Sequence, residues 1–219
     1  MTGQPKYFTP KKLTESEPFI SYTIISGNYF KVANRLRSFT RTGHDGLQDH
    51  YFVFPAVTMF VAAFEAFLQE HLAYALRNEK EQSDSALLAN LKSQTPPYNE
   101  FKAWVKEIYK IFDQKEVGID TNADVYHNLL ALKELRNTVV HYNPAFIEHI
   151  SWPARLEQAL HLTKLEVINS GWVAQFSRPE VADWAYKSTK DAVEHFAQLS
   201  GAENPFTVTL ERNGLPPWE

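Results

Sequence analysis

The stretch "FVFPAVTMFVAAFEAFL", residues 52–68, is the most apolar part of the chain and decides its fold class. It lies in a helix predicted from about residue 50 to 79, because large apolar side chains recur there at helical spacing: Phe60, Phe64, Phe67, Leu68 and Leu72. The stretch contains a proline and a glutamate, and it is shorter than the roughly 20 apolar residues that a membrane span needs. It therefore predicts a buried core helix in a cytoplasmic protein without membrane contact.

The composition of the whole chain fits a single domain. Of its 219 residues, 44% are hydrophobic and 14% aromatic, which is enough for one sizeable core. Because there is no cysteine, disulfides and thiolate metal sites are excluded. The formal net charge of −4 argues against a large basic surface that coats nucleic acid, but it is compatible with a small, local phosphate-binding cluster.

Helices joined by short loops account for most of the sequence, so we predict an all-α, up-and-down helical bundle. Further helices are predicted over 28–40, 84–93, 98–113, 122–142, 151–169 and 177–199. Residues 1–17 lack apolar periodicity and an apolar signal-peptide core, and they are expected to form a loose N-terminal arm. Residues 18–200 then form the single domain, in which residues 19–25 fit either a strand or the start of the first helix. Residues 201–219 form a C-terminal tail with a short strand.

Two local features outside the core helix lead to specific predictions. Ser177 and Glu180 have the spacing of a capping box, which predicts that Ser177 caps the helix over 177–199. Trp218 lies in the terminal "LPPW", where an exposed indole can dock on a partner subunit.

The candidate site lies in "LRNTVVHYNP", residues 135–144, at the end of the helix predicted over 122–142. Arg136 falls within an apolar stripe formed by Val125, Leu129, Leu132 and Val139. Burying an unpaired guanidinium is very costly, so Arg136 must be paired, solvated through a groove, or placed at an interface. Asn137 and His141 are four residues apart and share a face next to Arg136.

These three residue types suit RNA cleavage by attack of the RNA's own 2′-hydroxyl. Histidine can transfer protons near neutral pH, and arginine can stabilise the charge that develops on the phosphate. Asparagine can hold a hydroxyl, a phosphate oxygen or the imidazole in place. No metal is required by this chemistry, and the eight histidines include neither H-x-x-x-H nor H-E-x-x-H, so we expect no zinc site and no cofactor.

The segment "RNTVVH" resembles the R-x4-6-H motif of HEPN domains, with Arg136, Asn137 and His141 as its catalytic members. The resemblance covers residues 28–200 in architecture, but only the six motif residues carry specificity. It implies a helical bundle that acts as a metal-independent endoribonuclease, of the toxin or defence type, on an RNA substrate. It also implies a homodimer in which two motifs face each other across a cleft, and an antitoxin or a nucleotidyltransferase-like protein as a further partner.

Other residues near the motif have alternative interpretations. Tyr142 can stack on a base or contact phosphate, or it can serve only in packing. Glu65, the acid embedded in the core helix, is expected to pair with a cation and orient it. Alternatively, Arg136 pairs with Glu65 or Glu70 inside one chain, and His141 merely caps its helix. His71 lies near the apolar face and is expected to be a hydrogen-bonded core histidine.

The pattern R-x4-6-H alone is weak, because the pairs Arg37/His44 and Arg155/His161 also satisfy it. Only Arg136 has an asparagine beside it, a helix-end context and a place in an apolar stripe. Two further functions remain open: a non-catalytic HEPN-like module that binds nucleotide, RNA or a protein partner, and a helical interaction domain with a coincidental motif. The acidic overall charge favours the first of these two slightly, since tight RNA binding draws on several phosphate contacts.

Overall fold

The computed structural model describes residues 25–42, 50–82, 100–113, 117–141, 156–167, 171–202, 204–206 and 218. These residues form seven α-helices and contain no strand: α1 (Ser26–Thr42), α2 (His50–Gln82), α4 (Phe101–Phe112), α5 (Asp124–Val140), α6 (Glu157–Thr163), α7 (Gly171–Phe176) and α8 (Pro179–Ser200). The fold is thus an all-α helical bundle, as the sequence predicts. The N-terminal arm over 1–17, the helix over 84–93 and the strand of the tail lie outside the described residues.

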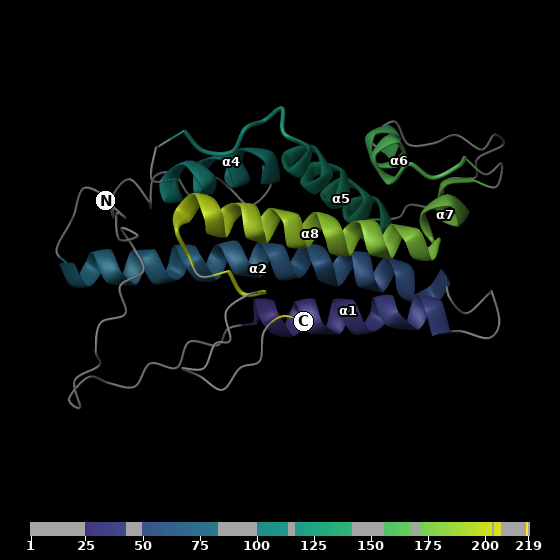
Figure 1. Cartoon of the computed structure of the whole chain (residues 1–219), viewed down its shortest axis with the longest axis horizontal. Coiled ribbons are helices and arrows are strands. Elements are labelled where there is room, and N and C mark those ends of the chain that lie inside the picture. Colours follow the sequence, from purple (N-terminus) through teal and green to yellow (C-terminus); the bar gives the residue numbers. More distant parts are fainter. Residues whose placement is uncertain are drawn as a thin grey trace.

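Helices α2 and α8 lie side by side at the centre of the bundle (Figure 1). Helix α1 packs along α2 on one side, whereas α4 and α5 pack against α8 on the other, with α6 next to α5. Helices α1, α5 and α8 all pack against α2 and cover the apolar side chains of its buried face.

The apolar side chains of α2 form the main core. Those that the sequence placed on its buried face are all at most 5% exposed: Phe60, Phe64, Phe67, Leu68 and Leu72. The apolar part of α2 extends over 23 residues, Tyr51–Ala73, so its length and composition do not exclude a membrane span, contrary to the prediction from residues 52–68 alone. The most apolar window of this segment is 56% buried inside the bundle, which is the packing of a core helix.

Trp218 is part of this core, so the prediction of an exposed indole that docks on a partner subunit is wrong. Its side chain is 3% exposed and stacks on Phe30 of α1, with ring centroids 5.2 Å apart. It also meets Phe67 of α2 edge to face, and its backbone N–H donates to the carbonyl oxygen of Pro205. The reason is local: Gly27 and the aromatic ends of α1 and α2 leave a site that fits an indole.

The N-terminus of α1 is capped from α2. The Glu70 carboxylate accepts hydrogen bonds from the backbone N–H groups of Ile25 and Ser26, at 2.6 and 2.9 Å, and from the Ser26 hydroxyl. A carboxylate at this end also interacts favourably with the helix dipole. Glu70 therefore caps the N-terminus of α1, and it is not the partner of Arg136.

Two predicted helix boundaries differ from the structure. Helix α8 begins at Pro179, with Arg178 in the cap position and no side-chain cap, so the capping box at Ser177 is wrong. The Ser177 hydroxyl instead donates to the carbonyl oxygen of Ala174, at the end of α7, a helix that the sequence did not predict. The helix predicted over 151–169 ends at Thr163, because Lys164 adopts the left-handed conformation.

Candidate functional site

The three motif residues lie at the C-terminal end of α5, as predicted. The helix ends at Val140, and His141 follows as its cap residue. The backbone N–H of His141 donates to the carbonyl oxygen of Asn137 at 2.9 Å, which leaves the imidazole exposed beyond the last turn. Asn137 is half-buried, one turn earlier. The end of the helix therefore presents an amide and an imidazole together, on the face predicted from their spacing.

Arg136 is half-buried, and it lies beside the buried face of α5 rather than within it. Of the predicted stripe, Leu129 and Leu132 are buried, whereas Val125 and Val139 are only partly so. The buried face instead consists of Tyr126, Leu129, Ala131, Leu132, Lys133, Leu135 and Thr138. The prediction that Arg136 interrupts the apolar stripe is thus wrong in detail. The residue that does occupy a buried position is Lys133.

The guanidinium of Arg136 makes one hydrogen bond within the described part of the chain. Its Nη1 donates to Oδ1 of Asn137 at 3.0 Å. Neither Glu65 nor Glu70 pairs with it, because Glu65 binds Lys133 and Glu70 caps α1. The alternative in which Arg136 is neutralised by one of these two acids is therefore wrong. A guanidinium carries five N–H donors, so most of those of Arg136 remain available to a ligand.

Arg136, Asn137 and His141 all line one cleft of about 820 Å³ between α5 and the first turns of α4, with one residue from α6. Its lining consists of Glu100, Phe101, Lys102, Ala103, Lys106, Leu130, Lys133, Glu134, Arg136, Asn137, His141 and Gln158. Four of these residues are lysine or arginine and two are glutamate, but one of the four, Lys133, is paired with Glu65, which leaves three cations against two acids. The cleft therefore carries a small excess of cations, which the net charge of −4 does not exclude.

A buried ion pair lies beneath the cleft and was missed from the sequence. The Lys133 ammonium contacts the Glu65 carboxylate, and their side chains are only 11% and 8% exposed. The ammonium also lies 5.0 Å from the centroid of the Phe101 ring, on the opposite wall. Glu65 thus has the cation partner that we predicted, and that partner is Lys133. A lysine between Leu132 and Leu135 on a buried face was the signal available in the sequence.

The described residues between α4 and α5 are tied to the C-terminal end of α4. The Asp113 carboxylate accepts hydrogen bonds from the backbone N–H groups of Val117 and Gly118, both at 2.8 Å. Gly118 has a φ of 83°, in the left-handed region that glycine adopts without strain. On the other side, the Trp184 indole of α8 donates to Asn128 Oδ1 at 2.7 Å and anchors α5 to the central helices. Both contacts lie at the N-terminal end of α5 and fix it against its neighbours, whereas the motif residues lie at the opposite end of the helix.

The remaining candidate residues do not join this site within the described part of the chain. Tyr142 lies outside the described residues, as do His44 and Arg155 of the two competing motif matches. His161 is exposed on α6 and does not line the cleft. No group of three or more histidine, aspartate or glutamate side chains that could hold a metal ion occurs among the residues described.

His71 is the hydrogen-bonded core histidine that the sequence predicts. Its Nδ1–H donates to the carbonyl oxygen of Phe67 at 2.8 Å, and its ring packs against Phe67, Phe112 and Phe196. Burial among these rings lowers the pKa of His71 from 6.5 to about 4, although the hydrogen bond to Phe67 opposes this shift. The side chain is therefore neutral at pH 7 and belongs to the core.

Comparison of the chain with protein-family models, with curated proteins and with solved structures gave no match. The fold and the cleft thus define an all-α bundle with a cationic cleft at the end of α5. The resemblance to HEPN domains depends on the motif residues alone.

Proposed function

We propose that this protein is a HEPN-like, metal-independent endoribonuclease. The observation that carries the proposal is that Arg136, Asn137 and His141 line one cleft together, and that no described carboxylate neutralises Arg136. A phosphate in the cleft would meet a guanidinium with free donors and an imidazole, a group that can take up or give a proton. This is the combination that phosphodiester cleavage needs.

In the proposed reaction, the 2′-oxygen of the RNA attacks the adjacent phosphorus and the bond to the 5′-oxygen breaks. One base takes the proton of the 2′-hydroxyl, and one acid gives a proton to the departing 5′-oxygen, which leaves a 2′,3′-cyclic phosphate and a 5′-hydroxyl. Arg136 stabilises the additional negative charge on the phosphate. Asn137 orients Arg136 through the hydrogen bond between their side chains.

The reaction needs two proton-transferring groups, and among the described residues His141 is the one histidine that lines the cleft. We therefore propose a homodimer in which the histidines of two facing copies share the two proton transfers. His141 is exposed at a helix end, where a second copy can approach it. Sedimentation analysis tests this point: a dimer is expected, and a monomer that cleaves RNA would contradict it. An antitoxin or nucleotidyltransferase-like partner follows only from the resemblance.

The variant His141→Ala tests the catalytic proposal. Loss of a general acid or base lowers the rate by about 100-fold to 10,000-fold, so cleavage of a labelled RNA should fall by this factor in the presence of a chelator. The matched control is His161→Ala, which removes an exposed histidine that does not line the cleft. Circular dichroism and sedimentation should show an unchanged fold and oligomeric state. Wild-type cleavage by His141→Ala would end the proposal.

A non-catalytic binding module is the second candidate, and the acidic residues in the lining favour it. Glu100 and Glu134 lie in the same cleft as the cations and limit the number of phosphate contacts. Such a module would bind RNA or nucleotide without cleaving any of several RNA substrates. Product analysis of the wild-type protein distinguishes the two functions, since only the nuclease releases 2′,3′-cyclic phosphate ends.

A further inference from the structure

The wall of the cleft opposite the motif carries cations of its own. Lys102 and Lys106 of α4 both line the cleft, and both are exposed. They are four residues apart, so they project from the same face of the helix, about 6 Å apart along its axis. No described residue makes an ion pair with either ammonium. Two unneutralised lysines thus face the wall that carries Arg136 and His141.

The cleft is also too large for a single phosphate group. Its volume of about 820 Å³ lies toward the upper end of the range of about 300–1,000 Å³ that holds drug-sized ligands. If Arg136 and His141 hold the scissile phosphate, most of the cleft extends past them toward α4. The cations of α4 are then placed to contact a different phosphate of the same strand.

One aromatic ring completes this wall. Phe101 is half-buried, lines the cleft and precedes Lys102 directly; the Lys133 ammonium lies over its ring, 5.0 Å from the centroid, so a base would stack on the other face of the ring. Grooves that combine cations with aromatic rings are typical of proteins that bind single strands, because the cations follow the backbone and the rings stack on bases. A duplex presents its bases paired and stacked, so it cannot use such a ring.

We propose that Lys102 and Lys106 form a second phosphate subsite, and that the substrate class is single-stranded RNA that crosses the cleft from α5 to α4. This inference rests on the proposed function, since it takes Arg136 and His141 as the site of the scissile phosphate. The two lysines are binding residues: they hold the strand one or more phosphates away from the reacting atoms. They are expected to affect KM and leave kcat unchanged.

The test compares Lys102→Ala/Lys106→Ala with Lys110→Ala in the full chain. Lys110 is the next residue in the same i, i+4 row of α4 and is exposed, but it does not line the cleft. Binding is measured with a fluorescent 2′-O-methyl oligoribonucleotide, which cannot be cleaved by 2′-hydroxyl attack, over a range of salt concentrations. Each phosphate contact to a single strand contributes about 0.7 to the slope of log K against log salt. The double variant should therefore lower this slope by about 1.4, whereas Lys110→Ala should leave it unchanged.

A second arm uses the same sequence closed into a hairpin duplex, which should bind more weakly than the single strand. The subsite is overturned if the double variant and Lys110→Ala give the same slope and KM, or if the duplex binds as tightly as the single strand. A lysine-dependent slope in a protein that cleaves no RNA would retain the subsite and overturn the nuclease. Cleavage that depends on His141 but not on the two lysines would retain the nuclease and overturn the subsite.

Discussion

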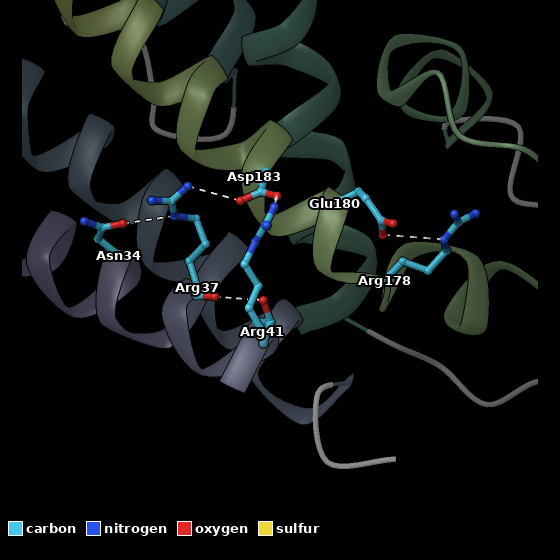
Figure 2. A network of polar contacts seen from close by, with 7 residues as sticks. Asn34, Arg37, Arg41, Arg178, Glu180 and Asp183 are labelled. Atoms are coloured by element: carbon cyan, nitrogen blue, oxygen red, sulfur yellow. Dashed lines mark hydrogen bonds and ion pairs between the residues drawn. The ribbon is translucent and has the colours of Figure 1, made fainter. Parts of the chain in front are cut away.

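Arg37 and Arg136 both begin an R-x4-6-H match, yet their surroundings differ. Arg37, on α1, donates from Nη1 to the Asp183 carboxylate of α8 at 3.1 Å and from Nε to Asn34 at 3.0 Å (Figure 2). Its guanidinium also lies 4.0 Å from the centroid of the Tyr186 ring. Arg136, on α5, has only the Asn137 side chain as a described partner. Arg37 therefore joins α1 to α8, whereas most N–H donors of Arg136 make no hydrogen bond with a described residue.

The difference shows that the sequence pattern alone does not identify a functional arginine. Asp183 also pairs with Arg41, so a single carboxylate links two turns of α1 to the start of α8 (Figure 2). Such a network stabilises the fold, and the Asp183 carboxylate already neutralises the charge of Arg37. Arg136 instead faces a cleft in which the acids are fewer than the cations. What distinguishes Arg136 from Arg37 is that no described carboxylate pairs with its guanidinium; the spacing to a histidine does not distinguish them.

The largest effect on stability is expected from disrupting the buried ion pair between Lys133 and Glu65, beneath the cleft that Arg136 lines. Lys133→Ala leaves Glu65 as a buried carboxylate without its partner, so the free energy of unfolding should fall by about 3–5 kcal/mol. Urea denaturation measures this change. In the double variant Glu65→Gln/Lys133→Met, no uncompensated charge remains, and most of the loss should be recovered. Lys110→Ala is the exposed control and should change stability by less than about 0.5 kcal/mol. A loss in Lys133→Ala no larger than in this control would show that the pair is not buried in solution.

His71 and His141 differ in a similar way: His71 is packed among aromatic rings and hydrogen-bonded to Phe67, whereas His141 is exposed at the end of α5. The pKa of His71 is about 4 in the folded state and 6.5 in an unfolded chain, so below pH 6.5 the unfolded state takes up a proton that the folded state resists. Stability from this group is fully present above pH 6.5 and is lost as the pH falls toward 4, by about 3 kcal/mol in total. His71→Phe should remove this part of the pH dependence in thermal or urea unfolding. His161→Ala should retain it, and an unchanged profile in His71→Phe would contradict the assignment.

Smaller effects are expected from the two arginines. Arg37→Ala removes a hydrogen bond to a carboxylate and a cation–π contact, so it should lower the free energy of unfolding by about 1–2 kcal/mol. Arg136→Ala removes only a contact with its sequence neighbour and should change stability by less than about 0.5 kcal/mol. Denaturant midpoints of the two variants give the comparison. Equal losses would show that Arg136 is as structural as Arg37.

The fold class was predictable because α2 carries its signal locally. Large apolar side chains at helical spacing over 50–79 predict a buried helix, and the structure confirms the burial of Phe60, Phe64, Phe67, Leu68 and Leu72. Local signals also predicted α1, α4 and α5, each with ends within three residues of those observed. The burial of Trp218 was not predictable from local signals, because it depends on a contact with Phe30, nearly 190 residues away in the sequence.

The candidate site was predictable only in part. Local spacing places Asn137 and His141 together at the end of α5, because i and i+4 positions share a face. The partners of Glu65 and Glu70 were not predictable, since several cations and helix ends compete for each carboxylate until the packing is known. Lys102 and Lys106 were missed for the same reason: only the bundle brings α4 across from α5.

The central claim is that the Arg136 guanidinium is available to a phosphate whereas that of Arg37 is not. It is tested most directly by the initial rate of RNA cleavage in Arg136→Ala and Arg37→Ala, at a temperature where circular dichroism shows both to be folded. Removing one stabilising donor lowers the rate by about 100-fold to 1,000-fold, so Arg136→Ala should lose cleavage by this factor while Arg37→Ala cleaves like the wild type. Equal rates in the two variants would contradict the claim.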